Sequence, residues 1–224
     1  MRVELSGVTK GHDAEDLPAT SATFISGSAS LAVAETEQRP TVLGLIASGR
    51  MRPDTGTRAL RHSIALVDAP GVSDPDAGVP LVGVVAEELM FAGRRADPLA
   101  ARRWLDEVGF RSLASTAIAD IEPTTRLRVL CELAALRPDV AGLVVTAPDR
   151  HGGQPLDWWQ LCGEFAERGF AVLAVAGRAS EWAITHAAVI ERAEAAEASL
   201  RYSLGALDER TAAWAQSGGG VDNA

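Results

Sequence analysis

Short, continuous apolar runs recur in the middle and later parts of the chain. Three of them are rich in β-branched residues: Ser63–Val67, Ala141–Thr146 and Phe170–Ala176. Strands that are covered by helices on both faces show this pattern, because neither face alternates with solvent-facing positions. The pattern therefore predicts three parallel strands inside an α/β sheet.

Helical periodicity fills the sequence between these runs. Apolar residues at helical spacing predict one helix that starts at Pro123 and ends before Pro138, and another that carries Trp158 and ends at Gly169. Strands and helices in alternation imply a parallel sheet with right-handed crossovers. A helical insertion with a polar face is predicted at about residues 93–125.

Both ends of the chain differ from this pattern. Residues 1–8 alternate only in part, and Ala22–Ser26 and Ser30–Ala34 are short apolar stretches on either side of Gly27. We expect these segments to form a small antiparallel β layer. Residues 182–216 have helical spacing, and residues 217–224 have the composition of a flexible tail. We expect a single domain over residues 1–216.

The charge balance narrows the classes of function. The chain has 224 residues, with 21 Lys and Arg against 30 Asp and Glu, and a formal net charge of −9. Binding to a phosphate backbone needs clustered basic side chains, so nucleic acid is not an expected partner. Lys10 is the single lysine and does not stand in a G-x-x-x-x-G-K-[ST] motif, so the sequence holds no intact phosphate-binding loop.

The pattern of cysteines and apolar runs indicates no metal, disulfide or membrane chemistry. Cys131 and Cys162 stand far apart with no C-x-x-C motif, so we expect two buried, reduced thiols. The N-terminus has no signal-peptide core, and no apolar run approaches the roughly 18 residues of a membrane span. The expected protein is cytoplasmic, without a metal or a cofactor.

Several segments, in this order, resemble the ATP-binding domain of ABC transporters. Arg2–Lys10 resembles the opening strand of that family, and Val42–Gly56 resembles the helix after the phosphate-binding loop, with its R-P-x-x-G ending. Val84–Gly93 resembles the stretch after the Q-loop, and Arg126–Asp139 resembles the helix that leads into the Walker B strand. The resemblance spans residues 1 to about 180. It implies a P-loop-NTPase-like α/β fold with a parallel-sheet core, a small N-terminal antiparallel layer and an inserted helical subdomain.

The same resemblance places the functional motifs of the family on residues that lack their chemistry. The Walker A position has lost both glycines and its lysine, and it now holds Ala34, Glu35, Glu37, Arg39, Pro40 and Thr41. The Walker B aspartate and the catalytic glutamate fall on Thr146 and Ala147. The signature motif falls on Ile121–Thr125, the Q-loop glutamine falls near Asp68, and the switch histidine falls near Gly177.

These replacements remove the magnesium ligand, the general base and the γ-phosphate sensor. The resemblance therefore implies a subunit that does not hydrolyse ATP, holds no cofactor or metal and has no catalytic residue. The expected partner is a membrane transport or export protein, an ABC ATPase subunit, or both. A homodimer is a further alternative.

Six residues are candidates for contact with such a partner: Glu87, Glu88, Arg150, His151, Trp158 and Trp159. The acidic pair lies where ABC domains face the membrane subunit. The Arg-His pair aligns with the dimer interface of the family, and tryptophans are enriched at binding hot spots.

Two other functions stay open. One is an ATP-binding subunit that still binds or hydrolyses ATP through a non-standard loop. The other is a small hydrolase in which His151, two residues after Asp149, acts in acid–base chemistry. No serine or cysteine stands in a G-x-S-x-G nucleophile elbow.

Overall fold

The computed structural model describes residues 1–59, 62–187 and 189. Contacts divide the chain into two units, Met1–Trp182 and Ala183–Ala224, and the strands and helices named below lie in the first unit. The predicted helical region at 182–216 lies mostly outside the described residues. The predicted tail at 217–224 lies wholly outside them.

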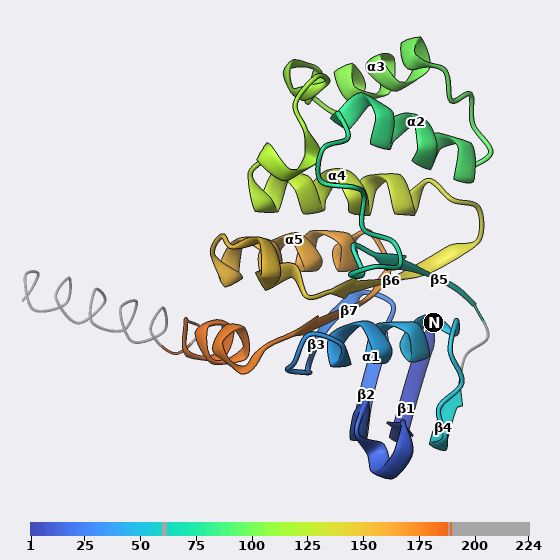
Figure 1. Cartoon of the computed structure of the whole chain (residues 1–224), viewed down its shortest axis with the longest axis vertical. Helices are drawn as coiled ribbons and strands as arrows, with labels where there is room; N and C mark the ends of the chain where they lie inside the picture. Colours follow the sequence, from blue (N-terminus) through green and yellow to red (C-terminus); the bar gives the residue numbers. More distant parts are fainter. Residues whose placement is uncertain (60–61, 188, 190–224) are drawn as a thin grey trace, which may run out of the picture. The chain divides into compact units, whose positions relative to one another are not determined.

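The first unit contains two sheets (Figure 1). An antiparallel sheet has the strand order β2-β1-β4, and a parallel sheet has the order β3-β7-β6-β5. The strands are β1 (Arg2–Lys10), β2 (Leu17–Ile25), β3 (Ser28–Val33), β4 (Thr55–Ala59), β5 (Ser63–Val67), β6 (Val140–Thr146) and β7 (Ala171–Ala176).

Helices cover both faces of the parallel sheet. They are α1 (Arg39–Ser48), α2 (Leu81–Phe91), α3 (Pro98–Glu107), α4 (Pro123–Ala135) and α5 (Pro155–Glu167), with short 3-10 turns η1 (His12–Ala14), η2 (Arg111–Leu113), η3 (Ile118–Asp120) and η4 (Pro148–His151). Helix α1 packs between the two sheets, and α4 and α5 cover the opposite face of the parallel sheet. Helix α2 packs against both α3 and α4, so the helical layer starts before the insertion predicted at residues 93–125.

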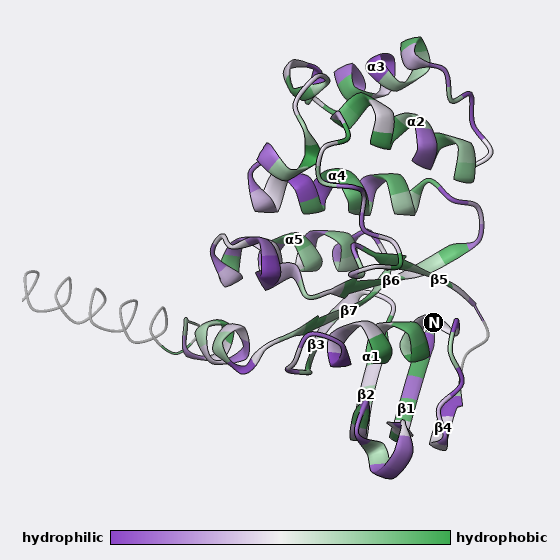
Figure 2. Cartoon of the chain, viewed as in Figure 1, coloured by the Kyte–Doolittle hydropathy of each residue, from purple (hydrophilic) through white to green (hydrophobic). Residues whose placement is uncertain are grey.

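The three predicted parallel strands are confirmed as β5, β6 and β7 (Figure 2). Each residue of β7 is buried, and the hydrophobic strands form the middle of the unit. Burial on both faces explains why these strands read as continuous apolar runs.

A bulge explains the partial alternation of the N-terminal strand. Val3, Leu5 and Val8 are buried, and the pairing register between β1 and β2 shifts between Leu5 and Val8. Gly7 lies inside this shift with a φ of 56°, a conformation that glycine adopts at low cost. After the bulge, the next buried side chain is therefore Val8 and not residue 7.

The prediction that Ser30–Ala34 belongs to the antiparallel layer is wrong. Residues 28–33 form β3, which pairs in parallel with β7, from Ser28 opposite Ala171 to Val33 opposite Ala176. β4 instead takes the third place in the antiparallel sheet, through its pairing with β1. The two short apolar stretches are therefore neighbours in sequence that belong to different sheets.

Two further expectations concern thiols and membrane spans. Cys131 and Cys162 are buried and free, as expected. Burial raises the pKa of the Cys162 thiol to about 12, which keeps it protonated and unreactive at neutral pH. Within the described residues, no helix has the length and apolar character needed to cross a bilayer.

Candidate functional site

The carboxyl ends of the parallel strands surround a cavity of about 490 Å³, which we call the edge cavity. The segments that follow β3, β5, β6 and β7 all contribute to its lining. Its charged residues are Glu35, Glu37, Asp149 and Arg150. This edge is where α/β proteins place ligands, and carboxylates outnumber the cation among the charged residues of the edge cavity.

The segment before α1 is held by its own contacts. The carboxylate of Glu35 accepts a hydrogen bond from the backbone N–H of Arg178 at 2.9 Å, and a second Glu35 oxygen lies 3.3 Å from the Arg178 side chain. The hydroxyl of Thr36 accepts from the N–H of Arg39 at 3.3 Å. The guanidinium of Arg39 donates to the carbonyl of Glu15, away from the edge cavity. The segment that the sequence resemblance assigns to the Walker A motif is therefore held by its own hydrogen bonds and lines the edge cavity.

The N-terminus of α1 has few groups that could bind an anion. Pro40 stands in the first turn without a backbone N–H, and the exposed Glu37 lies beside it. Ala34 is buried at the end of the preceding strand. Thr41 is the residue that matches the family motif, and its buried hydroxyl has no hydrogen-bond partner among the described residues.

At the position that the resemblance assigns to Walker B, the first residue is enclosed by packing. Thr146 is fully buried at the end of β6, and a Cβ built on Gly44 of α1 would lie 2.7 Å from its hydroxyl oxygen. Ala147 follows with a φ of 48° and lines the edge cavity with a methyl group. Neither side chain is a metal ligand of the carboxylate type that magnesium prefers.

Helix α4 follows the segment that the resemblance assigns to the signature motif. A carboxylate of the same chain caps its N-terminus. The side chain of Glu122 caps α4, and its two oxygens accept from the N–H groups of Thr124 at 2.8 Å and Thr125 at 2.7 Å. Partial burial opposes ionisation, but these N–H groups outweigh it and lower the pKa of Glu122. Glu122 thereby fills the place where this end of a helix would receive an anion, a role that the sequence pattern did not reveal.

A buried ionic cluster lies beside the edge cavity, and the sequence pattern did not predict it. Asp68 follows β5, is 2% exposed and accepts from Arg126 of α4 at 2.7 Å and from Arg150 of η4 at 3.0 Å. Burial opposes ionisation, yet the hydrogen-bond contacts with His151 and Arg126 and the nearby arginine charges lower the pKa of Asp68 to about 2. The cluster joins three segments that the sequence keeps far apart.

His151 belongs to this cluster and not to an Asp149 pair. Its Nε2 lies 3.1 Å from a carboxylate oxygen of Asp68 and 2.8 Å from Nε of Arg150. Asp149 instead accepts from the N–H of Gly177 and the hydroxyl of Ser180, each at 2.9 Å. Among the described residues, no serine, threonine or cysteine side chain makes a hydrogen bond with His151. Among the described residues, His151 therefore has no hydrogen-bonded side chain that could act as the nucleophile of a hydrolase.

A second hollow, of about 360 Å³, lies between the segment after β5 and helix α2, and we call it the side groove. Val72 and Phe91 line it and are 46% and 56% exposed. Glu87 is exposed there, whereas Glu88 forms an ion pair with Arg137 at 2.5 Å. The predicted acidic pair therefore offers one available carboxylate, not two.

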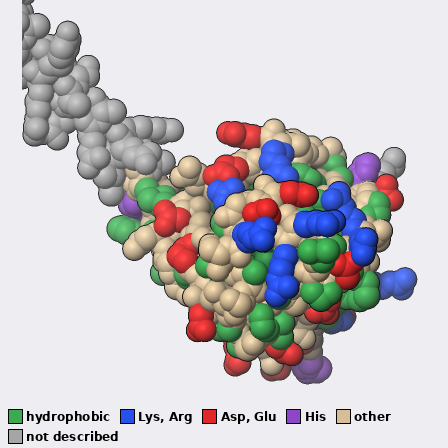
Figure 3. Space-filling view, turned by 90° about the horizontal axis from the view of Figure 1, so that it is seen from above, with side chains coloured by type: hydrophobic (Ala, Val, Ile, Leu, Met, Phe, Trp, Pro, Cys, Tyr) green, Lys and Arg blue, Asp and Glu red, His purple; other side chains and the backbone are tan. Residues whose placement is uncertain are grey.

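Arg50 is the available cation of the side groove. Partial burial and the charge of Arg137 lower its pKa, and it forms no ion pair within the described part of the chain. On the face over α2 and α3, arginines are interspersed with carboxylates (Figure 3). That mixture makes no broad field of one sign on this face.

The adjacent tryptophans have different environments. Trp158 is 2% exposed and packs in the core, whereas Trp159 is half-buried, and their rings meet edge to face at 6.4 Å. Trp158 therefore cannot contact a partner on this surface, which corrects its place among the candidate contact residues.

Comparison with solved structures finds the same fold. An ATP-binding protein of an ABC transporter from Pyrococcus furiosus matches with a TM-score of 0.56 and 13% identity, over 79% of this chain and 92% of that one. A metal-chelate type ABC transporter in an inward-facing conformation matches with a TM-score of 0.55 and 15% identity, over 78% and 72%. An ATP-binding subunit of an ABC transporter matches with a TM-score of 0.51 and 16% identity, over 79% and 80%. No protein-family model and no curated protein matches the sequence. The chain has the fold of ABC transporter ATP-binding domains, as the sequence resemblance implied.

Proposed function

We propose that this chain is a non-hydrolysing relative of ABC ATP-binding domains that acts as a cytoplasmic protein-interaction subunit of a membrane transport or export complex. The observation that carries the proposal is the Glu122 cap. In the family that the sequence resembles, the signature motif and the helix after it receive a phosphate group. In this chain the carboxylate of Glu122 already holds the first N–H groups of α4.

The chemistry of the edge cavity supports the same proposal. A triphosphate brought to the start of α1 would meet Glu35 and Glu37, and Pro40 takes one N–H away from the cradle. Like charges at short range in a partly dry site cost several kcal/mol unless a cation intervenes. Thr146 and Ala147 supply neither a carboxylate for magnesium nor a base for the attacking water.

The side groove is the proposed docking place for the membrane partner. It combines exposed apolar surface, from Val72 and Phe91, with one available cation, Arg50, and one available carboxylate, Glu87. A short amphipathic helix of the partner fits such a groove. It would place an apolar side chain against the Phe91 ring and charged side chains near Arg50 and Glu87. The guanidinium of Arg137 lies over the Phe91 ring, 5.6 Å from its centre, and helps to hold the ring in place.

A titration with Mg-ATP tests the loss of nucleotide chemistry. We expect millimolar Mg-ATP to leave the midpoint of thermal unfolding unchanged and to release no phosphate. A ligand present at a thousandfold excess over its dissociation constant would stabilise the fold by about 4 kcal/mol, which corresponds to a rise of roughly 10 °C for a chain of this size. A rise of several degrees that needs magnesium would favour the ATP-binding subunit with a non-standard loop.

A substitution in the side groove tests the docking place. We expect Phe91→Asp to reduce capture of the partner from detergent-solubilised membranes of the source cells at least tenfold. An aromatic side chain that becomes buried at the centre of an interface contributes about 2 kcal/mol or more to binding. Capture by the full-length chain is quantified against Leu99→Asp. Leu99 is 54% exposed on α3, outside the side groove. If both variants lose capture equally, or if neither loses it, the side groove is not the docking place.

A further inference from the structure

One short segment separates the edge cavity from the side groove. Pro70, at its start, lines the edge cavity, and residues 72–75 form one wall of the side groove. The segment is a compact turn: the carbonyl of Ala69 accepts from the N–H groups of Val72, Ser73 and Asp74 at 3.0, 3.0 and 3.2 Å. A carboxylate oxygen of Asp74 accepts from the N–H of Gly71 at 2.8 Å.

Arg150, which also lines the edge cavity, contacts residues before and within this turn. Its guanidinium donates to the backbone carbonyl of Asp68 at 2.6 Å and to the Asp68 carboxylate at 3.0 Å, and it lies 3.4 Å from the carboxylate of Asp74. Asp68 immediately precedes Ala69 and the turn, and Asp74 lies at the end of the turn. A planar guanidinium can serve several acceptors at once in a fixed geometry, which a lysine ammonium cannot do equally well.

Asp68 keeps Arg150 in place. The Asp68 carboxylate is also held by Arg126 of α4, whose side chain is 4% exposed, so the anchor point lies in the core of the unit. Arg150 itself remains 20% exposed and lines the edge cavity. One side chain therefore faces the edge cavity and also bonds a residue of the side-groove wall.

We infer that Arg150 is a positioning residue for the side groove: it fixes the turn from Pro70 to Asp74 and thereby presents Val72 to a partner. The inference rests on the proposed function of the side groove as a docking place. A wall that is ordered before the partner arrives binds it more tightly, because less conformational freedom is lost on binding.

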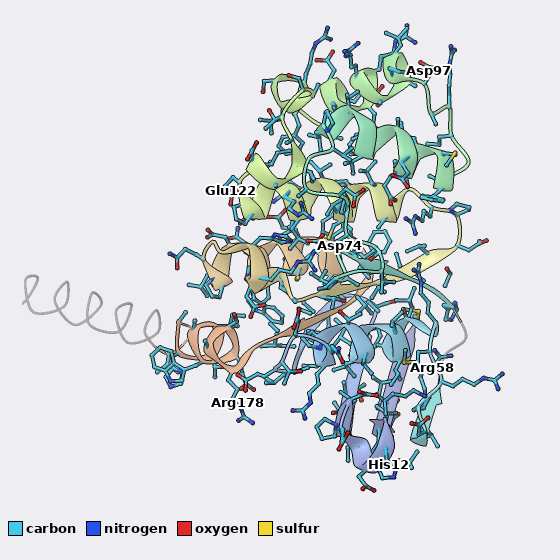
Figure 4. All side chains as sticks on the ribbon, viewed as in Figure 1. His12, Arg58, Asp74, Asp97, Glu122 and Arg178 are labelled. Carbon is cyan, nitrogen blue, oxygen red and sulfur yellow. The ribbon has the colours of Figure 1, made fainter. Side chains whose placement is uncertain are left out.

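Amide hydrogen exchange on the protein alone tests this role. We expect Arg150→Ala to exchange the amides of residues 71–74 about tenfold faster or more, while the amides of β6 and β7 keep their rates. The matched control is Arg178→Ala. Arg178 follows β7 beside the same edge cavity and pairs with Glu35, whereas Asp74 lies in the turn after β5 (Figure 4). The control should leave residues 71–74 unchanged.

Rescue of Arg150→Ala by free guanidinium distinguishes a positioning role of Arg150 from a general loss of stability. Millimolar guanidinium should slow the exchange of residues 71–74 again in Arg150→Ala and should not change it in the wild type, because the free cation can occupy the vacated place between the two carboxylates. If Arg150→Ala does not fold, Arg150→Lys keeps the charge, and its exchange at residues 71–74 should still exceed that of the wild type.

Two results would overturn the inference. One is unchanged exchange at residues 71–74 in both Arg150 variants. The other is equal acceleration in all strands, which would make Arg150 a contributor to global stability alone. The exchange measurement needs no partner and no nucleotide, so it can succeed when the Phe91→Asp and Mg-ATP experiments fail. Failure of the proposed function and failure of the inference are thus distinguishable.

Discussion

Asp68→Asn is expected to lower the free energy of unfolding by about 4 kcal/mol, because it removes the buried carboxylate to which Arg126 and Arg150 are both paired. The amide has the shape of the carboxylate but not its charge. It would leave Arg126, with a side chain 4% exposed, as a buried cation without its counter-charge, and would also weaken the hold on Arg150. Urea denaturation of both proteins at neutral pH measures the difference.

Acid titration of stability provides a second signature of the same group. The pKa of Asp68 is lowered from 3.8 to about 2, so its contribution to stability is complete above pH ~4 and is lost as the pH falls from about 4 to 2. Asp68→Asn should show a shallower loss over this range. Asp54→Asn is the control: Asp54 pairs with Lys10 at the surface, where solvent screens the pair, and its replacement should cost much less stability than Asp68→Asn. Similar losses in the two variants would contradict the assigned role of Asp68.

Gly44→Val is expected to lower the free energy of unfolding by about 3 kcal/mol through overpacking. A Cβ at this position would lie 2.7 Å from the hydroxyl oxygen of Thr146 and 3.0 Å from a methyl carbon of Leu66, so helix α1 would be pushed off the sheet. Urea denaturation measures the loss. The extra removal of the Thr146 side chain, as Gly44→Val with Thr146→Ala, should recover part of it, because the two positions share one space.

Gly163→Val is the matched control for this packing effect. Gly163 also lies inside a helix, α5, but a Cβ there meets nothing within 4 Å. We expect its unfolding free energy to change by less than about 1 kcal/mol. A loss as large as that of Gly44→Val would point to helix propensity and not to the close approach of α1 and β6.

The sequence was most informative where a local pattern alone determines an element. Continuous apolar runs predicted β5, β6 and β7, because strands covered on both faces need no polar positions. The placement of residues 28–33 was wrong for a physical reason: a short strand after a glycine turn suits a hairpin, and its true partner, β7, lies near the other end of the described chain. Nothing local distinguishes these two pairings.

The candidate site was predictable only in its outline. The resemblance located the positions that meet at the carboxyl edge of the sheet, including Glu35, Thr146 and Ala147. It did not reveal that Asp68 pairs with Arg126 and Arg150, which are 58 and 82 residues away in the chain. Contacts at such separations depend on the tertiary fold, and a single Asp after a buried strand gives no sign of which cation will reach it. Pro123 marked the start of α4, but the Glu122 cap was not predicted, because glutamate is not among the residues that usually cap a helix N-terminus.

The pairing of β3 with β7 also has a consequence for synthesis on the ribosome. β3 is made early, but its parallel partner emerges only after β6 and α5, and typical elongation rates place that event on the order of ten seconds later. During this interval the apolar face of α1 and one edge of β3 have no sheet to join. The nascent chain must therefore pass through a stage with exposed apolar surface, in which chaperone binding competes with aggregation, and a translational pause before residue 171 would lengthen that stage.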